Sequence, residues 1–164
     1  MVSGTTGWLE KYDEAVEECK KQGTAFLYAS NFSLGVNLFF ELNRKLAKLM
    51  ADFKEYEVSI EEVHHVHKLD APSGTAISLA EQILERSNKK QWTLDQAGSH
   101  ELQITAKREN EVPGTHTVSY ESAIDRINIE HKAYNRDGFA LGALLAAEWI
   151  VGKTGVFTMN DVLF

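Results

Sequence analysis

The chain has 164 residues, of which 43% are hydrophobic and 25% are charged. That composition supplies one hydrophobic core and part of a second, and it is not the composition of a disordered chain. A formal net charge of -7 and a pI near 5.4 exclude an extended nucleic-acid surface, which would need clustered Lys and Arg.

Cysteine content and hydropathy indicate a cellular compartment. The single cysteine, Cys19, excludes an intrachain disulfide framework and fits a reducing environment. The sequence shows neither a signal peptide nor a long apolar run. We therefore expect a cytoplasmic protein whose partners include neither nucleic acid nor membrane.

The first thirty residues have the pattern of a loop, a helix and a strand. Residues 4–7 predict the loop, residues 9–22 an amphipathic helix closed by Gly23, and residues 24–29 a buried strand. This order is typical of the last crossover unit in a doubly wound parallel-sheet domain.

A long helix and a strand follow. The helix begins after Asn31 or Ser33, either of which is a plausible cap, and reaches about Phe53, because apolar residues recur at spacings of three and four. Val58 and Ile60 then alternate with polar residues, as in a half-buried strand.

The strand leads into EEVHHVHKLDAPSGTA, residues 61–76, where three histidines and a lysine precede a Pro-Ser-Gly-Thr turn. Strand parity would put His64 and Lys68 on the apolar face, but about 3.3 Å per residue would separate them by roughly 13 Å. Both can serve one small ligand only if the chain turns between them. Because residues next to Pro72 leave regular structure, we expect the strand to end near His65.

Ser73 is the expected N-cap of a helix whose apolar positions begin at Ile77. The unpaired amides of its first turn and the positive end of the helix dipole favour a carboxylate or phosphate, and Gly74 allows close approach. A plain helix cap remains the alternative to an anion site. With imidazoles and an ammonium nearby, the segment predicts an acid catalyst beside a carboxylate clamp.

The histidines also have simpler interpretations. They could be structural or surface residues, or they could bind a metal. In a strand, His65 and His67 share a face while His64 points away, and no cysteine or paired acid completes a tetrahedral set. The sequence therefore predicts no metal site.

The rest of the chain predicts a sheet and a final helix. Residues 88–99 are polar and irregular, and three strands are expected at residues 102–108, 115–122 and 125–133. A last helix covers residues 138–151. The expected fold class is α/β with α+β character: a mixed β-sheet with helices on one face, plus a remnant of a Rossmann-type domain.

The pattern E-x-H-H-x-x-K-x-D-A-P-S-G-T-A, from Glu62 to Ala76, resembles the signature of dihydrodipicolinate reductases. The resemblance extends over nearly the whole chain. Its further matches are residues 4–8 and 29–33, Gly35, Asn37, Arg108, Gly114, His116, residues 131–133 and Arg136. Enzymes of this family reduce a cyclic dicarboxylate with a nicotinamide cofactor in lysine and diaminopimelate synthesis.

The resemblance implies roles for individual residues. His64 would donate a proton and Lys68 would be its cationic partner in catalysis. The implied substrate contacts are His65, Ser73, Gly74, Thr75 and Thr6. The implied cofactor contacts, to NADH or NADPH, are Gly4, Thr5, Thr6, Asn31, Phe32 and Arg136.

The family begins with a dinucleotide-binding half that contains a glycine-rich turn, and this chain has no G-x-G-x-x-G. We therefore expect about a hundred residues of the family pattern to precede Met1. Residues 1–30 would be the end of the dinucleotide-binding domain, residues 31–135 the substrate and oligomerisation domain, and residues 136–164 a helix and tail that return to the first domain.

Two functional hypotheses follow. In the first, the chain is the substrate-binding half of the reductase, with impaired cofactor binding and little activity alone. In the second, it is a non-catalytic module that assembles a homo-oligomer, a tetramer in this family, through its sheet.

Overall fold

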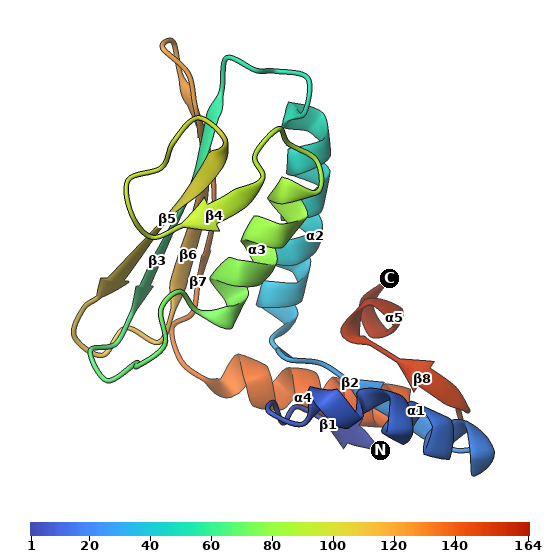
Figure 1. The fold of residues 1–164 in the computed structure, drawn as a ribbon. Helices are drawn as coiled ribbons and strands as arrows, with labels where there is room; N and C mark the ends of the chain where they lie inside the picture. The colour runs from blue at the N-terminus through green and yellow to red at the C-terminus, as the bar shows by residue number, and fades with distance from the viewer. The chain divides into compact units, whose positions relative to one another are not determined.

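In the computed structural model, which describes residues 1–164, the chain forms two compact units (Figure 1). The first unit combines Met1–Asn37 with Arg136–Phe164, and the second unit is Leu38–Asn135. None of the helices combines the length and the apolar character that crossing a membrane requires.

The second unit contains a five-stranded mixed sheet in the order β4-β5-β3-β6-β7. The central strand β3 pairs in parallel with β5 and in antiparallel with β6, and β6 and β7 form an antiparallel hairpin. The strands are β3 (Glu57–His64), β4 (Gln91–Thr93), β5 (Glu101–Arg108), β6 (Thr115–Glu121) and β7 (Arg126–Lys132).

Two helices, α2 (Leu34–Met50) and α3 (Gly74–Leu84), cover one face of this sheet (Figure 1). Every second residue of the three central strands points into the core beneath them. The amide of the buried Asn43 ties α2 to α3 by donating to the Leu79 carbonyl over 3.1 Å. The buried strand residues of this core are Val58, Ile60, Leu102, Ile104, Val118 and Tyr120.

The same alternation carries polar residues onto the core face at one end of the sheet. Glu62 and His64 continue the buried positions of β3. The register pairs Glu62 with His116 of β6 and His64 with Arg108 of β5. Three strands therefore deliver ionisable side chains to one place.

The first unit is built on a three-stranded parallel sheet in the order β1-β2-β8, with its own small core. Gly142 is essential to this packing, because a Cβ at that position would overlap the carbonyl oxygen of Phe32. Its elements are β1 (Val2–Ser3), α1 (Tyr12–Lys21), β2 (Ala25–Tyr28), α4 (Asp137–Trp149), β8 (Gly155–Phe157) and α5 (Met159–Leu163).

The predicted mixed sheet with helices on one face is confirmed, together with its α/β character. Three details differ. Residues 88–99 contain β4, which the polar sequence concealed, and the elements β8 and α5 follow the last predicted helix. The first helix begins with a 3₁₀ turn, Leu9–Lys11, before α1.

Candidate functional site

A buried carboxylate, that of Glu62, is the centre of the polar cluster in the second unit. Its side chain is 0% exposed. The backbone N–H of Ser73 donates to both carboxylate oxygens, over 3.1 and 3.0 Å. The guanidinium of Arg108 donates to Oε1 from Nη1 and Nη2, each over 3.3 Å. Glu62 thus joins β3, β5 and the start of α3.

The surroundings of Glu62 keep it ionised. Burial alone would raise the pKa of the carboxyl group, because it removes the charged form from water. Interactions with His116 and with the hydroxyl and amide of Ser73 outweigh burial and lower the pKa to about 2. A negative charge is therefore present beneath α3 throughout the physiological pH range.

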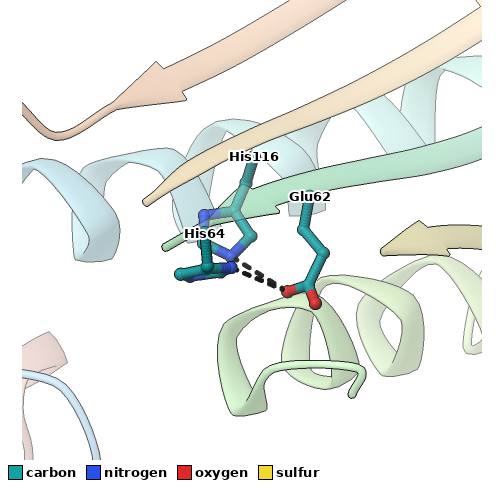
Figure 2. A group of neighbouring side chains, drawn as sticks. All are labelled: Glu62, His64 and His116. Carbon is teal, nitrogen blue, oxygen red and sulfur yellow. Dashed lines mark ion pairs between the residues drawn. The ribbon is translucent and has the colours of Figure 1, made fainter. Parts of the chain in front are cut away.

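Two imidazoles converge on Oε2 of this carboxylate (Figure 2). Nδ1 of His64 lies 3.5 Å from it, and Nε2 of His116 lies 3.7 Å from it. His116 Nε2 is also 3.0 Å from the Ser73 hydroxyl oxygen. The two imidazole rings meet edge to face, with 5.0 Å between their centroids.

His64 closes β3 and is 8% exposed. Burial lowers its pKa most; the Glu62 charge opposes that effect, and the charges of His116, Lys68 and Arg108 add to it, giving a pKa of about 4. The ligand-free imidazole is therefore neutral at pH 7. An added negative charge beside it would favour the protonated form.

The chain turns directly after His64, as the distance argument required. The Lys68 amide donates to the His65 carbonyl over 3.1 Å, which closes the turn. Arg108 holds the segment in place by donating to the carbonyls of Asp70, over 2.6 Å, and of Lys68. The turn brings Lys68 close enough for its charge to affect the pKa of His64.

Ser73 is the N-cap of α3, as predicted. Its hydroxyl oxygen accepts the Ala76 amide over 3.2 Å. A side chain added at Gly74 would meet nothing within 4 Å, so the backbone there faces open space. The positive end of α3 adds to the positive charges of Arg108 and Lys68, an arrangement that favours an anion.

The predicted cofactor residues lie in the first unit, and all but Arg136 follow the carboxyl ends of two adjacent parallel strands. Residues 4–6 follow β1 and residues 31–32 follow β2, and this edge is where open α/β sheets bind ligands. A Cβ at Gly4 would lie 3.0 Å from the Phe32 ring, so glycine lets the two loops pack together. Arg136 is the N-cap residue of α4. That these loops contact a dinucleotide stays a prediction.

One ligand atom each of Glu62, His64 and His116 lies within 4.8 Å of the others, which is the spacing of a metal site. The spacing of the neighbouring histidines alone did not reveal this group. Ser73 and Arg108 already occupy the carboxylate, and a metal cation would be repelled by Arg108 and Lys68. The charges favour proton transfer beside an anion.

Three residues of the cluster had no assigned role in the sequence prediction: Glu62, Arg108 and His116. A signal for them existed. Glu62 and His116 occupy buried positions of their strands, and Arg108 continues the alternation of β5 at a half-buried position, where an apolar residue is expected. Several ionisable residues at core positions near the ends of neighbouring strands indicate a site.

Comparisons with known proteins identify the family to which the chain is similar. The family described as "Dihydrodipicolinate reductase, C-terminus" matches residues 35–163. The 4-hydroxy-tetrahydrodipicolinate reductase of Christiangramia forsetii is 63% identical, over 99% of this chain and 69% of its own length. That of Methanopyrus kandleri is 41% identical, over 100% of this chain and 62% of its own.

A solved structure is also similar, that of a dipicolinate-bound dihydrodipicolinate reductase from Paenisporosarcina sp. TG-14. It has a TM-score of 0.73 and 25% sequence identity, and the match covers 99% of this chain and 64% of that one. The chain therefore spans roughly two thirds of the length of each of these relatives.

Proposed function

Because the chain belongs to the dihydrodipicolinate reductase family, we propose that its second unit is the substrate-binding half of a reductase that acts on a cyclic dicarboxylate. The substrate would be dihydrodipicolinate or its 4-hydroxy-tetrahydro form, in lysine and diaminopimelate synthesis. The observation that carries this proposal is the His64 imidazole beside Glu62, whose carboxylate accepts the N-cap amide of α3, with Lys68 nearby.

In this proposal, Lys68 and the first-turn amides of α3 bind the carboxylates of the substrate. Ser73, Gly74 and Thr75 form that first turn, and His65 contacts the ligand from the preceding turn. A dicarboxylate suits the site because cationic groups and a helix N-terminus both favour negative charge.

His64 would supply the proton. A dianionic ligand raises the pKa of the imidazole from about 4 toward neutrality, so that substrate binding and proton uptake occur together. The proton then sits on the ring when the substrate is in place, and it quenches the negative charge that develops during reduction.

NADH or NADPH would supply the hydride. Gly4, Thr5, Asn31 and Phe32 would contact it at the carboxyl edge of the β1-β2 sheet, and we assign Thr6 and Arg136 to the same region. Because the chain has no G-x-G-x-x-G turn, we expect it to bind the cofactor weakly by itself.

Calorimetric titration with pyridine-2,6-dicarboxylate, the dipicolinate of the similar structure, tests the substrate site. The native chain should bind it, and Lys68→Ala should weaken binding by about tenfold or more, because a charge-assisted contact in a partly buried site is lost. Lys107→Ala is the matched control, because Lys107 pairs with Glu61, which lies outside the core face. A folded native chain that does not bind would refute the proposal.

A second candidate function, assembly of a homo-oligomer, rests on β7. This strand forms an edge of the sheet, and its residue Ile127 is 40% exposed to solvent. An unpaired edge next to an apolar side chain favours burial against another copy. We propose a homo-oligomer, a tetramer by family resemblance. Light scattering that gives the mass of one chain would count against it.

A further inference from the structure

We infer that Glu62 is a positioning residue for the reduction: its carboxylate holds the Nδ1 proton of His64 and, through the Ser73 amide, orients the N-terminus of α3. This inference rests on the proposed function, since it concerns how that reaction's proton donor is held.

The position of Glu62 needs an explanation. It occupies a core position of β3, two residues after Ile60 on the same face, where a charged group is normally unfavourable. The Ser73 amide and the Arg108 guanidinium compensate for the lost water. An apolar residue would need neither partner, so the packing of the core does not by itself require this charge.

The first task concerns His64. Its Nδ1 is buried and makes no hydrogen bond, and Glu62 Oε2 lies 3.5 Å from it (Figure 2). A carboxylate beside Nδ1 stabilises the tautomer that carries its proton there. Nε2 is then the atom that receives and gives the catalytic proton.

Gly114 supports this assignment of Nε2. A Cβ on Gly114 would lie 3.1 Å from His64 Nε2, so any side chain at position 114 would crowd that atom. The φ of Gly114 is +155°, a value that also favours glycine. The carboxylate therefore faces one ring nitrogen, and the missing side chain at position 114 leaves room beside the other.

The second task concerns α3. Both oxygens of Glu62 accept the N–H of Ser73, the N-cap residue, while the Ser73 hydroxyl caps the helix through Ala76. One side chain thus contacts both the proton donor and the start of the anion-binding helix. Their separation is set by Glu62, and small displacements of this kind strongly affect reaction rates.

The charges around His64 make the carboxylate necessary. The groups that face the imidazole are Glu62, His116, Lys68 and Arg108, and of these only Glu62 favours the protonated ring. His131, opposite His116 on β7, adds no negative charge. Without Glu62, all the remaining charged neighbours would oppose protonation of His64, and none would favour it.

The proton balance is simple. Protonated His64 gives its Nε2 proton to the reduced substrate, and the electron pair of that bond stays on Nε2. The Nδ1 proton stays on the ring, facing Glu62, which remains a carboxylate throughout. Glu62 therefore acts through His64 and does not itself transfer a proton.

The test compares Glu62→Gln with Glu61→Gln. The first keeps the shape and one oxygen for the Ser73 amide but removes the charge. The control changes the adjacent residue, which faces away from the core and pairs with Lys107 over 2.7 Å. ¹⁵N chemical shifts of His64 at pH 7, without ligand, report which ring nitrogen carries the proton.

We expect the Nδ1–H tautomer in the native chain and in Glu61→Gln, and a shift toward the Nε2–H tautomer in Glu62→Gln. An unchanged tautomer in folded Glu62→Gln would overturn the inference, whether or not the chain binds a dicarboxylate. If circular dichroism shows that Glu62→Gln is unfolded, the tautomer of His64 is measured in Glu62→Asp. This variant keeps the negative charge, so His64 should keep its proton on Nδ1. A switch to the Nε2–H tautomer in Glu62→Asp would refute the inference.

Calorimetry in two buffers of different ionisation enthalpy provides the second readout. On binding pyridine-2,6-dicarboxylate at pH 7, the native chain should take up protons. Glu62→Gln should take up fewer protons on binding, because the pKa of His64 in the complex falls when the neighbouring carboxylate loses its charge. Absence of binding by the native chain would refute the proposed function alone, because the tautomer measurement needs no ligand.

Discussion

The ammonium of Lys68 lies 2.7 Å from both carboxylate oxygens of Asp70, two residues further along the chain. The Lys68 side chain is 19% exposed and that of Asp70 is 62% exposed. Hydrogen bonding to Lys68 lowers the pKa of Asp70, which keeps the pair charged. In the absence of ligand, the Asp70 carboxylate pairs with the ammonium of Lys68, which is the group that we propose binds the substrate. A substrate carboxylate must therefore displace Asp70 from Lys68.

Asp70→Asn should therefore strengthen the binding of pyridine-2,6-dicarboxylate. Because the pair is partly exposed to solvent, we expect a gain of about two- to fivefold, which corresponds to the usual strength of such a pair. Calorimetry measures it, with the exposed Asp95→Asn as control. Weaker binding in Asp70→Asn would instead show that Asp70 holds Lys68 in its binding position.

Acid should destabilise the second unit in two overlapping stages. His64 and Glu62 both have lowered pKa values, so the unfolded chain binds protons more readily than the folded one. The free energy of unfolding should fall between pH 6.5 and about 4, where His64 takes up a proton. It should fall again between pH 4.5 and about 2, where the Glu62 carboxylate takes up a proton. The Glu62 stage is worth about 3 kcal/mol.

Urea unfolding at a series of pH values measures this dependence. His64→Gln should flatten the curve between pH 6.5 and 4, while His100→Gln, at an exposed position, should leave it unchanged. Equal slopes in His64→Gln and the native chain would mean that His64 titrates normally in the folded protein.

Gly142→Ala should destabilise the first unit. The new methyl group would collide with the Phe32 carbonyl, and a collision with backbone is relieved only by moving α4. We expect a loss of about 1 to 3 kcal/mol in the free energy of unfolding. At Gly138, on the same helix, a Cβ would meet only the Ser33 hydroxyl oxygen at 3.5 Å, so thermal unfolding of Gly138→Ala should match or exceed the native midpoint.

Hydride transfer by the purified chain should be absent or very slow, since the pyrophosphate of the cofactor lacks a glycine-rich turn to bind it. Nicotinamide absorbance in the presence of the cyclic dicarboxylate substrate measures the rate. Rapid oxidation of the cofactor that His64→Ala abolishes would show that the chain is an active reductase by itself.

Local patterns were sufficient to predict much of the fold and part of the site. Alternation in β3 predicted a strand that ends near His65, and Pro72 and Ser73 predicted the turn and the start of α3. These features depend on residues that are neighbours in the sequence, and they therefore leave a readable signal.

The contacts of Glu62 could not be predicted in the same way. Its partners Arg108 and His116 are 46 and 54 residues away, and they meet it only through the register of β5 and β6 on β3. Register depends on long-range packing, which a single sequence does not reveal. The strand β4 escaped prediction because its three residues lie in a polar stretch and pair only with β5.

The direct pairing of Glu62 with His116, and of His64 with Arg108, also makes the cluster a sensor of correct folding. A slip of β6 by one residue would turn His116 toward the opposite face of the sheet and separate it from the carboxylate. The imidazole resonances of His64 and His116 thus report whether the three strands have assembled in the native alignment. The same two imidazole resonances that report protonation at the site can therefore show whether a refolded or engineered chain has the native strand register.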